Sequence, residues 1–119
     1  MMEIIHAVIA KALDGLYVRQ AATAQNIANA GSDQYTRLEV TFEGALRDAL
    51  TAGTYDPMQT LEKVAHVDPA IIPVGLGGSN DVQIDQEIAS ASETSARYAL
   101  LIGMLDRSLQ LNQLAIRGG

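Results

Sequence analysis

A 3.5-residue repeat of apolar side chains from residue 84 to residue 116 constrains the fold of this chain more than any other feature. Steps of four and three residues alternate, and eight of the ten positions carry an apolar or aromatic side chain. The ten positions are Ile84, Ile88, Ala91, Ser95, Tyr98, Ile102, Leu105, Leu109, Asn112 and Ile116. This period is typical of a helix that packs against another helix in a left-handed coiled coil. It predicts a helix over residues 85–117, about 50 Å long, with Asp85 as its N-cap.

A second apolar segment, residues 3–30, predicts another long helix at the other end of the chain. Its apolar stripe includes Ile5, Ile9 and Leu16, and Gly31 follows where a glycine of positive φ commonly ends a helix. Two long helices of similar length most simply pack together as an antiparallel pair. The sequence therefore predicts a mainly α fold, a single domain of residues 1–119 built on a coiled-coil-like hairpin.

The connecting region, residues 32–84, is expected to be irregular and rich in loops. Residues 38–42 alternate apolar and polar side chains, which predicts a short extended segment, and the spacing over 43–51 predicts a short helix. Prolines and glycines then interrupt any regular pattern, so we expect residues 52–78 to be loop, mobile in the isolated chain. The interrupting residues are Pro57, Pro69, Pro73, Gly75, Gly77 and Gly78.

Composition and charge exclude several classes of protein. The net charge is −6, and the sequence pI near 4.6 argues against nucleic-acid binding, because no basic face is available to neutralise phosphates. Hydrophobic residues make up 48% of the chain and aromatic residues 4%, which suits slender helix packing. The chain contains no cysteine, so it has no disulfide framework. We expect neither a cleaved signal peptide nor a membrane span, because no basic segment precedes the N-terminal apolar stretch and no apolar run approaches about 20 residues.

No pattern in the sequence predicts catalysis, a cofactor or a metal site. His6, His66 and Asp68 have no spacing typical of metal ligands. The glycine-rich stretch 75–78 has no following lysine and no strand-loop-helix context, so it is not a phosphate loop. Asp81 and Asp85 have no neighbouring nucleophile or base. We therefore expect a protein that is not an enzyme.

The run from Asn26 to Ala30 places two carboxamides, those of Asn26 and Asn29, on one face of the N-terminal helix near its end. They could make hydrogen bonds between subunits. Alternatively, Asn29 caps or frays the helix end while Asn26 faces solvent. In the C-terminal helix, Ser95 and Asn112 either set the register of the seam or mark where the helix leaves its partner.

Both ends of the chain together resemble the flagellar basal-body rod proteins, most closely those of the proximal rod. The N-terminal match includes Arg19, the Asn26–Ala30 run, Tyr35, the stretch 40–43 and Leu46. The C-terminal match includes the stretches 80–82 and 84–87, Tyr98 and Leu105. The resemblance covers residues 5–50 and 79–117. The chain departs from the family at Gly31-Ser32-Asp33-Gln34, where family members commonly carry a Thr-Pro-Gly turn.

The resemblance implies a structural subunit of the rod that crosses the periplasm, exported by the flagellar type III apparatus without a cleaved signal. Its partners would be other rod proteins and the base of the flagellum (MS ring and export gate), with the terminal helices packed in a helical array. The expected assembly interface consists of Leu16, Asn26, Ile27, Asn29, Tyr98, Ile102, Leu105, Leu109 and Asn112. The alternative is a small acidic helical adaptor or export chaperone that binds partner helices in the cytoplasm. A hydrolase is a weaker third possibility.

Overall fold

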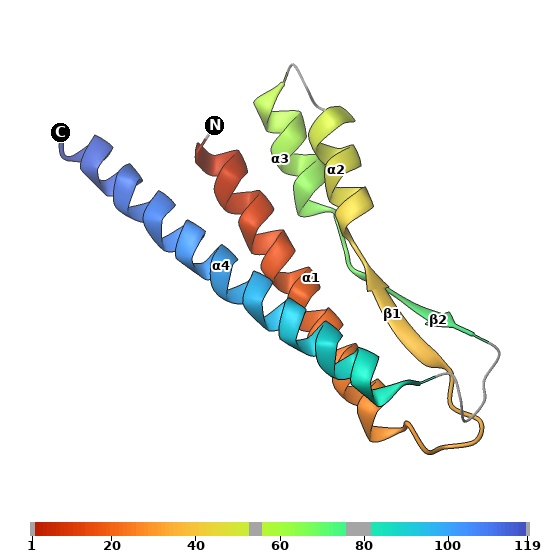
Figure 1. The fold of residues 1–119 in the computed structure, drawn as a ribbon. Coiled ribbons are helices and arrows are strands. Elements are labelled where there is room, and N and C mark those ends of the chain that lie inside the picture. The colour runs from red at the N-terminus through yellow and green to blue at the C-terminus, as the bar shows by residue number, and fades with distance from the viewer. Residues whose placement is uncertain (1, 53–55, 76–81, 119) are drawn as a thin grey trace.

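Two long helices run antiparallel along the molecule in the computed structural model, which describes residues 2–52, 56–75 and 82–118 (Figure 1). They are α1 (Met2–Ala28) and α4 (Ile84–Ile116). His6 of α1 contacts Ser108 of α4, and Gln20 contacts Ala91, so the two helices run in opposite directions. The molecule is slender, with principal extents of 60 × 27 × 13 Å. The predicted mainly α hairpin is confirmed.

Both helices lie within two residues of their predicted bounds, but two predicted caps are wrong. Gly31 does not have positive φ; the chain leaves α1 through turns in which Ala30 and Ser32 bond back to the preceding carbonyls. The N-cap of α4 is Gln83, whose side chain makes no capping bond. Asp85 lies two residues past the N-cap, at the second position of the helix, and its carboxylate accepts from the nitrogen of Gln86.

The connecting region is more regular than the sequence predicts. The short extended segment and short helix are present as β1 (Arg37–Thr41) and α2 (Glu43–Ala52). The prediction of loop over residues 52–78 is wrong, because the region also contains α3 (Pro57–Ala65) and β2 (Ala70–Val74). The strands β1 and β2 form an antiparallel pair, with Arg37 opposite Val74 and Thr41 opposite Ala70. Residues 53–55 and 76–78 lie outside the described residues.

The prolines are compatible with these elements because of where they stand. Pro57 occupies the first turn of α3, where a missing N–H costs nothing, and the side chain of Asp56 accepts from the nitrogen of Met58 at 3.0 Å. Pro73 lies in β2, a strand of a two-stranded sheet, where proline is tolerated. Proline therefore marks the beginning of one element and the edge of another, and interrupts neither.

The core consists of two adjoining apolar clusters on α1. The first packs Leu16 and Ala22 of α1 against Val40 and Phe42 at the end of β1, with Leu101 of α4 beside them. The second packs α2 and α3 against the N-terminal half of α1 through buried residues and through Ala7, Val8 and Ala12. Its buried residues are Leu46, Ala49, Val64 and Val67. The apolar cores are therefore built mainly by α1 with the middle of the chain, and α4 adds little to them.

Candidate functional site

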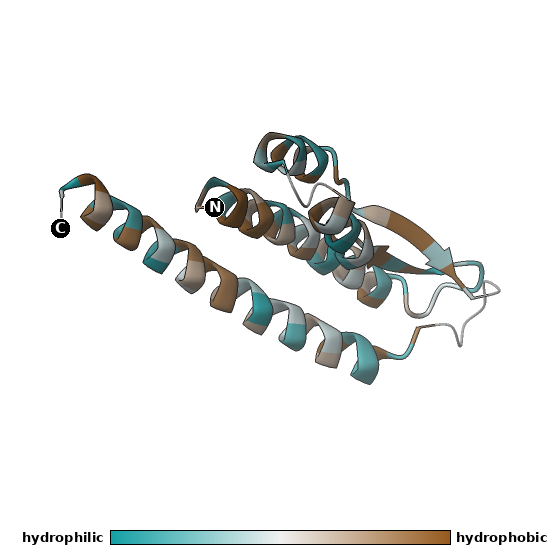
Figure 2. Cartoon of the chain, turned by 90° about the horizontal axis from the view of Figure 1, so that it is seen from above, coloured by the Kyte–Doolittle hydropathy of each residue, from teal (hydrophilic) through white to brown (hydrophobic). Residues whose placement is uncertain are grey.

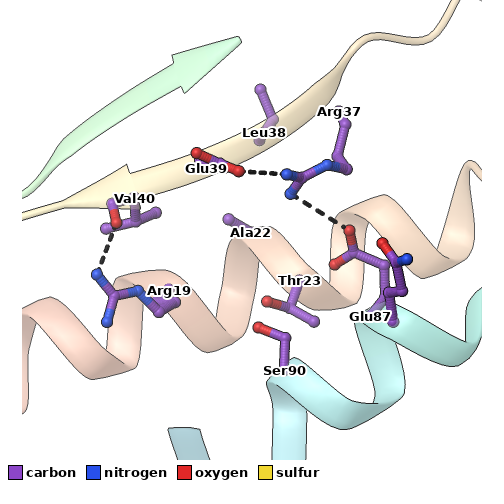
Figure 3. Close-up of a pocket in the computed structure, with 10 residues that line it drawn as sticks. Arg19, Ala22, Thr23, Arg37, Leu38, Glu39, Val40, Glu87 and Ser90 are labelled. Atoms are coloured by element: carbon purple, nitrogen blue, oxygen red, sulfur yellow. Dashed lines mark hydrogen bonds and ion pairs between the residues drawn. The ribbon is translucent and has the colours of Figure 1, made fainter. Parts of the chain in front are cut away.

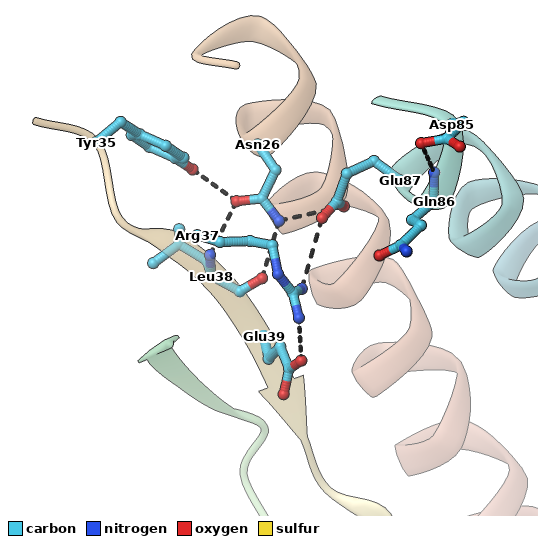
Figure 4. Close-up of polar contacts among 8 residues, drawn as sticks. All are labelled: Asn26, Tyr35, Arg37, Leu38, Glu39, Asp85, Gln86 and Glu87. Atoms are coloured by element: carbon cyan, nitrogen blue, oxygen red, sulfur yellow. Dashed lines mark hydrogen bonds and ion pairs between the residues drawn. The ribbon is translucent and has the colours of Figure 1, made fainter. Parts of the chain in front are cut away.

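The carboxamide of Asn26 holds the end of α1 to the start of β1 (Figure 4). Its Nδ2 donates to the backbone oxygen of Leu38 at 2.9 Å, and its Oδ1 accepts from the backbone nitrogen of Leu38 at 2.9 Å. The side chain thus satisfies both polar groups of one β1 residue, as a neighbouring strand would. Asn26 is 1% exposed, so the alternative in which it faces solvent is wrong.

Two further groups complete the hydrogen bonding of Asn26. Its Oδ1 also accepts from the hydroxyl of Tyr35 at 2.7 Å, and its Nδ2 also donates to Oε2 of Glu87 at 3.3 Å. A carboxamide offers two N–H donors and two acceptor lone pairs, so all of its positions are used within the chain. In this conformation Asn26 therefore has no capacity left for a hydrogen bond to a neighbouring subunit.

Glu87, in the first turn of α4, is the buried acid of this group. Its side chain is 6% exposed, and its Oε1 lies 3.5 Å from Nη1 of Arg37, which also bonds Glu39. A buried carboxylate is costly unless it is paired, and here an arginine and a carboxamide pair with it. Burial, and after it the charge of Glu87, raise the pKa of Tyr35. We name Asn26, Tyr35, Arg37, Leu38 and Glu87 the Asn26 cluster; it joins α1, β1 and α4.

A second polar contact, at Arg19, joins α1 to the corner between β1 and α2. The guanidinium donates to both carboxylate oxygens of Glu43 at 2.7 Å and to the backbone oxygen of Val40 at 2.7 Å. It also lies over the ring of Phe42, 4.9 Å from the centroid. The hydrogen bonds from Arg19 lower the pKa of Glu43 to about 2. Arg97 of α4 approaches the same carboxylate at 3.7 Å, so α4 is tied here as well.

A cavity of about 360 Å³ lies between these two polar contacts, bordered by α1, β1 and the start of α4 (Figure 3). Arg19 and Arg37 line it, and each is engaged by carboxylates: Arg19 by Glu43, and Arg37 by Glu39 and Glu87. Neither arginine is available as an unpaired cation for an anionic ligand. The cavity therefore belongs to the structural joint between the helices.

The residues of α4 that face α1 are not all those of the predicted seam. At every second seam position, the inward residue is the one that precedes the predicted residue. The inward positions, one heptad apart, are Glu87, Thr94, Leu101 and Ser108, which are buried or half-buried. The prediction placed Ile88, Ser95, Ile102 and Leu109 there, and all four are exposed. We name these two sets the inner stripe and the outer stripe. The predicted seam is therefore wrong at these four positions.

Polar contacts join α4 to α1 at both ends of the inner stripe and at one edge position between them. Glu87 bonds Asn26 near one end, and the hydroxyl of Ser108 lies 2.9 Å from Nε2 of His6 near the other. Between them, Nε2 of Gln20 donates to the backbone oxygen of Ala91 at 3.1 Å. The side-chain oxygen of Gln20 is buried without a hydrogen-bond partner. This interface is consequently polar and imperfectly satisfied.

The outer face of α4 is strongly apolar and exposed. In Figure 2, hydrophobic (brown) segments alternate with hydrophilic (teal) segments along the helix. Ile88 of the outer stripe is 53% exposed, and Ile102 and Leu109 are each 45% exposed. Other large apolar side chains of α4 are also exposed, namely Ile84, Tyr98, Leu100, Met104, Leu111, Leu114 and Ile116. A helix with apolar residues around most of its circumference is ordinarily buried on more than one side.

The energies at stake in the two faces are similar in size. Full burial of an aliphatic side chain contributes about 1.5–3 kcal/mol, so each half-exposed residue of the outer stripe forgoes about 1 kcal/mol. Turning α4 to bury that stripe on α1 would remove Glu87 from Asn26, and an unsatisfied buried polar group costs about 1–3 kcal/mol. The contacts of Glu87 are therefore comparable in energy with the apolar burial that the opposite face of α4 would gain.

Apart from Asn29, the residues of the predicted assembly interface fall into three groups. Leu16 and Asn26 are buried inside the chain, at 2% and 1% exposure, and do not present their side chains to other molecules in this conformation. Ile27, Leu105 and Asn112 are half-buried. Tyr98, Ile102 and Leu109 are exposed on the outer face of α4. The structure brings this last group together as one candidate surface.

Asn29 has the local role of a helix cap. Its Nδ2 donates to the backbone oxygen of Gln25 at 2.9 Å, which satisfies a carbonyl in the last turn of α1. This is the alternative in which Asn29 caps the helix end.

The sequence analysis did not predict that Glu87 and Arg37 belong to the Asn26 cluster, or that Glu43 pairs with Arg19. The signal that could have found Glu87 is its place in the heptad. Glu87 directly precedes Ile88, so a seam with the same heptad spacing could start at Glu87 and not at Ile88. Arg37 and Glu43 carry no such signal, because the partners that join them to other elements, Glu87 and Arg19, are 50 and 24 residues away in sequence.

The other titratable candidates have ordinary partners. Within residues 2–52, 56–75 and 82–118, no group of three or more His, Asp or Glu side chains could hold a metal ion. The ring of His66 bonds the backbone oxygen of Glu62 at 2.7 Å. Asp81 and the stretch 76–78 lie outside the described residues. No helix in the described part of the chain is long and apolar enough to cross a membrane.

A scan against models of known protein families gives no match to this chain, and neither does a search among curated proteins. The function considered next therefore rests on the residues and contacts described above.

Proposed function

We propose that this chain is a structural subunit of the bacterial flagellar basal body, a proximal-rod protein of the FlgB type. It polymerises through its terminal helices with other rod proteins above the MS ring and export gate. In this role the chain is exported without a cleaved signal peptide and resides in the rod that crosses the periplasm. It carries force between neighbours and performs no chemical reaction.

The observation that carries this proposal is the exposed apolar face of α4. Ile88 and Ile102 are 53% and 45% exposed although α1 lies alongside. Large apolar side chains left exposed along one helix are typical of a surface that contacts another protein. A helix that is already paired on one side and apolar on another suits packing between subunits.

The relative lengths of the helices also support assembly. Met2, the first described residue of α1, meets Ser108 of α4, so the turns of α4 from residue 109 onward extend past this contact. The exposed side chains there include Leu109, Leu111, Leu114 and Ile116. A projecting apolar end that contacts a different surface of the next subunit gives a heterologous, non-closing contact, which generates a filament.

The two sequence motifs that resemble rod proteins lie in contact, which also supports the proposed family. The Asn26 run, which carries the N-terminal resemblance, bonds Glu87, which lies in the C-terminal stretch 84–87. Two motifs far apart in sequence thus meet in one polar joint. Such a joint lets both ends of the chain act as one rigid body in an array.

Cell fractionation in the native bacterium tests the proposal. The intact chain should co-purify with detergent-extracted basal bodies, and its deletion should abolish rods. An Ile102→Asp variant should be lost from basal bodies, whereas Ala96→Asp, which puts the same charge on an exposed position outside the outer stripe, should be retained. If the chain stays in the cytoplasm bound to another export substrate, the adaptor or chaperone alternative replaces the rod subunit.

A further inference from the structure

α4 carries two heptad-spaced stripes that differ by one residue, which corresponds to about 100° around the helix. The inner stripe begins at Glu87 and the outer stripe at Ile88, and both share the edge positions at Ala91, Tyr98 and Leu105. Either stripe has the period needed to pack along α1. The helix therefore has two geometrically available orientations about its own axis.

The outer stripe is the more apolar of the two, yet it does not face α1. Ile102 and Leu109 are exposed, while Thr94 and Ser108 at the matching inner positions are buried or half-buried. Apolar burial alone favours the opposite orientation. Some specific contact must hold the polar face inward.

Glu87 provides that contact because it is the charged member of the inner stripe and the groups around it are fixed. Nδ2 of Asn26 lies 3.3 Å from its Oε2, and Nη1 of Arg37 lies 3.5 Å from its Oε1 (Figure 4). Asn26 is itself fixed by both backbone groups of Leu38. A rotation of α4 by one residue would separate the carboxylate from both partners.

We propose that Glu87 is a positioning residue that sets the rotation of α4 about its axis and so keeps the outer stripe free for a partner. The orientation of α4 is a property of the single chain. Only the benefit to a partner rests on the proposed function. Glu87 contributes specificity here: it selects one of two packings of the same helix.

Thiol reactivity in the isolated full-length chain measures the orientation, because the chain has no cysteine of its own. Thr94→Cys places a thiol on the inner stripe at a position 4% exposed, and Ser95→Cys places one on the exposed outer stripe. With Glu87 present, the Ser95→Cys thiol should react with a disulfide reagent at least about tenfold faster than the Thr94→Cys thiol. In the Glu87→Leu background the ratio should fall to about 1 or invert.

Glu93→Leu is the matched control. It also replaces an α4 carboxylate by leucine, but Glu93 is exposed and bonds Arg97 within its own helix. The rate ratio should be unchanged in this background. A Glu87→Leu chain that stays helical by circular dichroism with an unchanged ratio would overturn the proposal.

Glu87→Gln covers the case in which Glu87→Leu fails to fold. This substitution keeps the size of the side chain and removes the ion pair with Arg37, so the ratio should fall by about threefold or more. An unchanged ratio in a folded Glu87→Gln chain overturns the proposal as well.

Incorporation into basal bodies separates this inference from the proposed function. If the ratio collapses and incorporation is lost, both stand. If the ratio collapses but incorporation persists, α4 is positioned by Glu87 but its outer stripe is not the docking surface. If wild-type chain never enters basal bodies, the proposed function fails while the thiol measurement still decides the orientation.

Discussion

The ring of Phe42 lies directly against the backbone of α1 at Gly15. A Cβ placed on Gly15 would lie 2.3 Å from Cδ1 of Phe42, closer than any real contact. Arg19, one turn further along α1, places its guanidinium over the same ring. Gly15 therefore allows the corner between β1 and α2 to approach α1 closely enough for the bonds from Arg19 to Glu43 and Val40.

Gly15→Ala should destabilise the chain. In an exposed helix this change contributes up to about 1 kcal/mol of stability. Here the added methyl group must displace a ring that is 4% exposed, and overpacking of this kind costs about 1–3 kcal/mol. The unfolding free energy from urea titration should fall accordingly.

Gly103→Ala is the matched control for this change. Gly103 also lies inside a long helix, and no heavy atom lies within 4 Å of a Cβ built there. The same substitution should raise stability by up to about 1 kcal/mol. Equal effects at the two glycines would contradict the role assigned to Phe42.

Asn26→Asp should be strongly destabilising at neutral pH. The change keeps the shape of the side chain but removes both N–H donors, so the backbone oxygen of Leu38 loses its partner. It also places a second carboxylate beside Glu87 in a buried site. We expect a loss of about 2–4 kcal/mol in the free energy of unfolding.

Asn29→Asp provides the comparison for Asn26. The same chemical change removes one bond, to the backbone oxygen of Gln25, at the end of α1. Because this contact is exposed, the loss should be below about 1 kcal/mol. Measured losses of similar size at both positions would show that the Asn26 cluster does not act as described.

Glu43 should make the stability of the chain depend on pH in the acid range. Its pKa falls from 4.5 to about 2 because Arg19 bonds the carboxylate. A lowered folded-state pKa contributes stability above the unfolded-state pKa, and this contribution is lost as pH falls from about 4.5 through 2. The side chain is 44% exposed, so solvent screening limits the effect to about 1 kcal/mol or less.

Urea midpoints of wild type and Glu43→Gln at pH 7 and pH 2 measure this contribution. The wild-type chain should be the more stable of the two at pH 7, and the difference should shrink at pH 2. Glu93→Gln, which removes an exposed helical ion pair, controls for general loss of charge. A difference that grows toward acid would contradict the direction given for the pKa of Glu43.

The long helices could be predicted because their signals are local. Apolar periodicity located α1 and α4 to within two residues, and short-range patterns located β1 and α2. The helix α3 and the strand β2 were missed because prolines were read as interruptions. Position decides what a proline does, and the pairing that makes β2 a strand joins residues such as Leu38 and Pro73, far apart in sequence.

The candidate site could be predicted only in part, for a related reason. The apolar residues of α4 identified a surface, but not which side of it meets α1. In our proposal, the side of α4 that meets α1 depends on the contacts of Glu87 with Asn26 and Arg37. These residues are 61 and 50 positions away from Glu87 in sequence, respectively. Long-range polar pairs of this kind leave no periodic trace in one sequence, so a seam chosen from apolar residues alone differs by one position.

The projecting end of α4 gives the last prediction. A chain that ends after Ser108 lacks the last turns of α4. Of the described residues removed, 109–118, all are exposed except Asn112, which is half-buried. The free energy of unfolding should therefore change by less than about 1 kcal/mol. Incorporation into basal bodies should be lost.

A full-length variant with glutamine at Leu109, Leu111, Leu114 and Ile116 keeps the length and removes the apolar surface, and it should lose incorporation equally. Normal incorporation of that variant would show that the apolar side chains of this end make no contact essential to the rod.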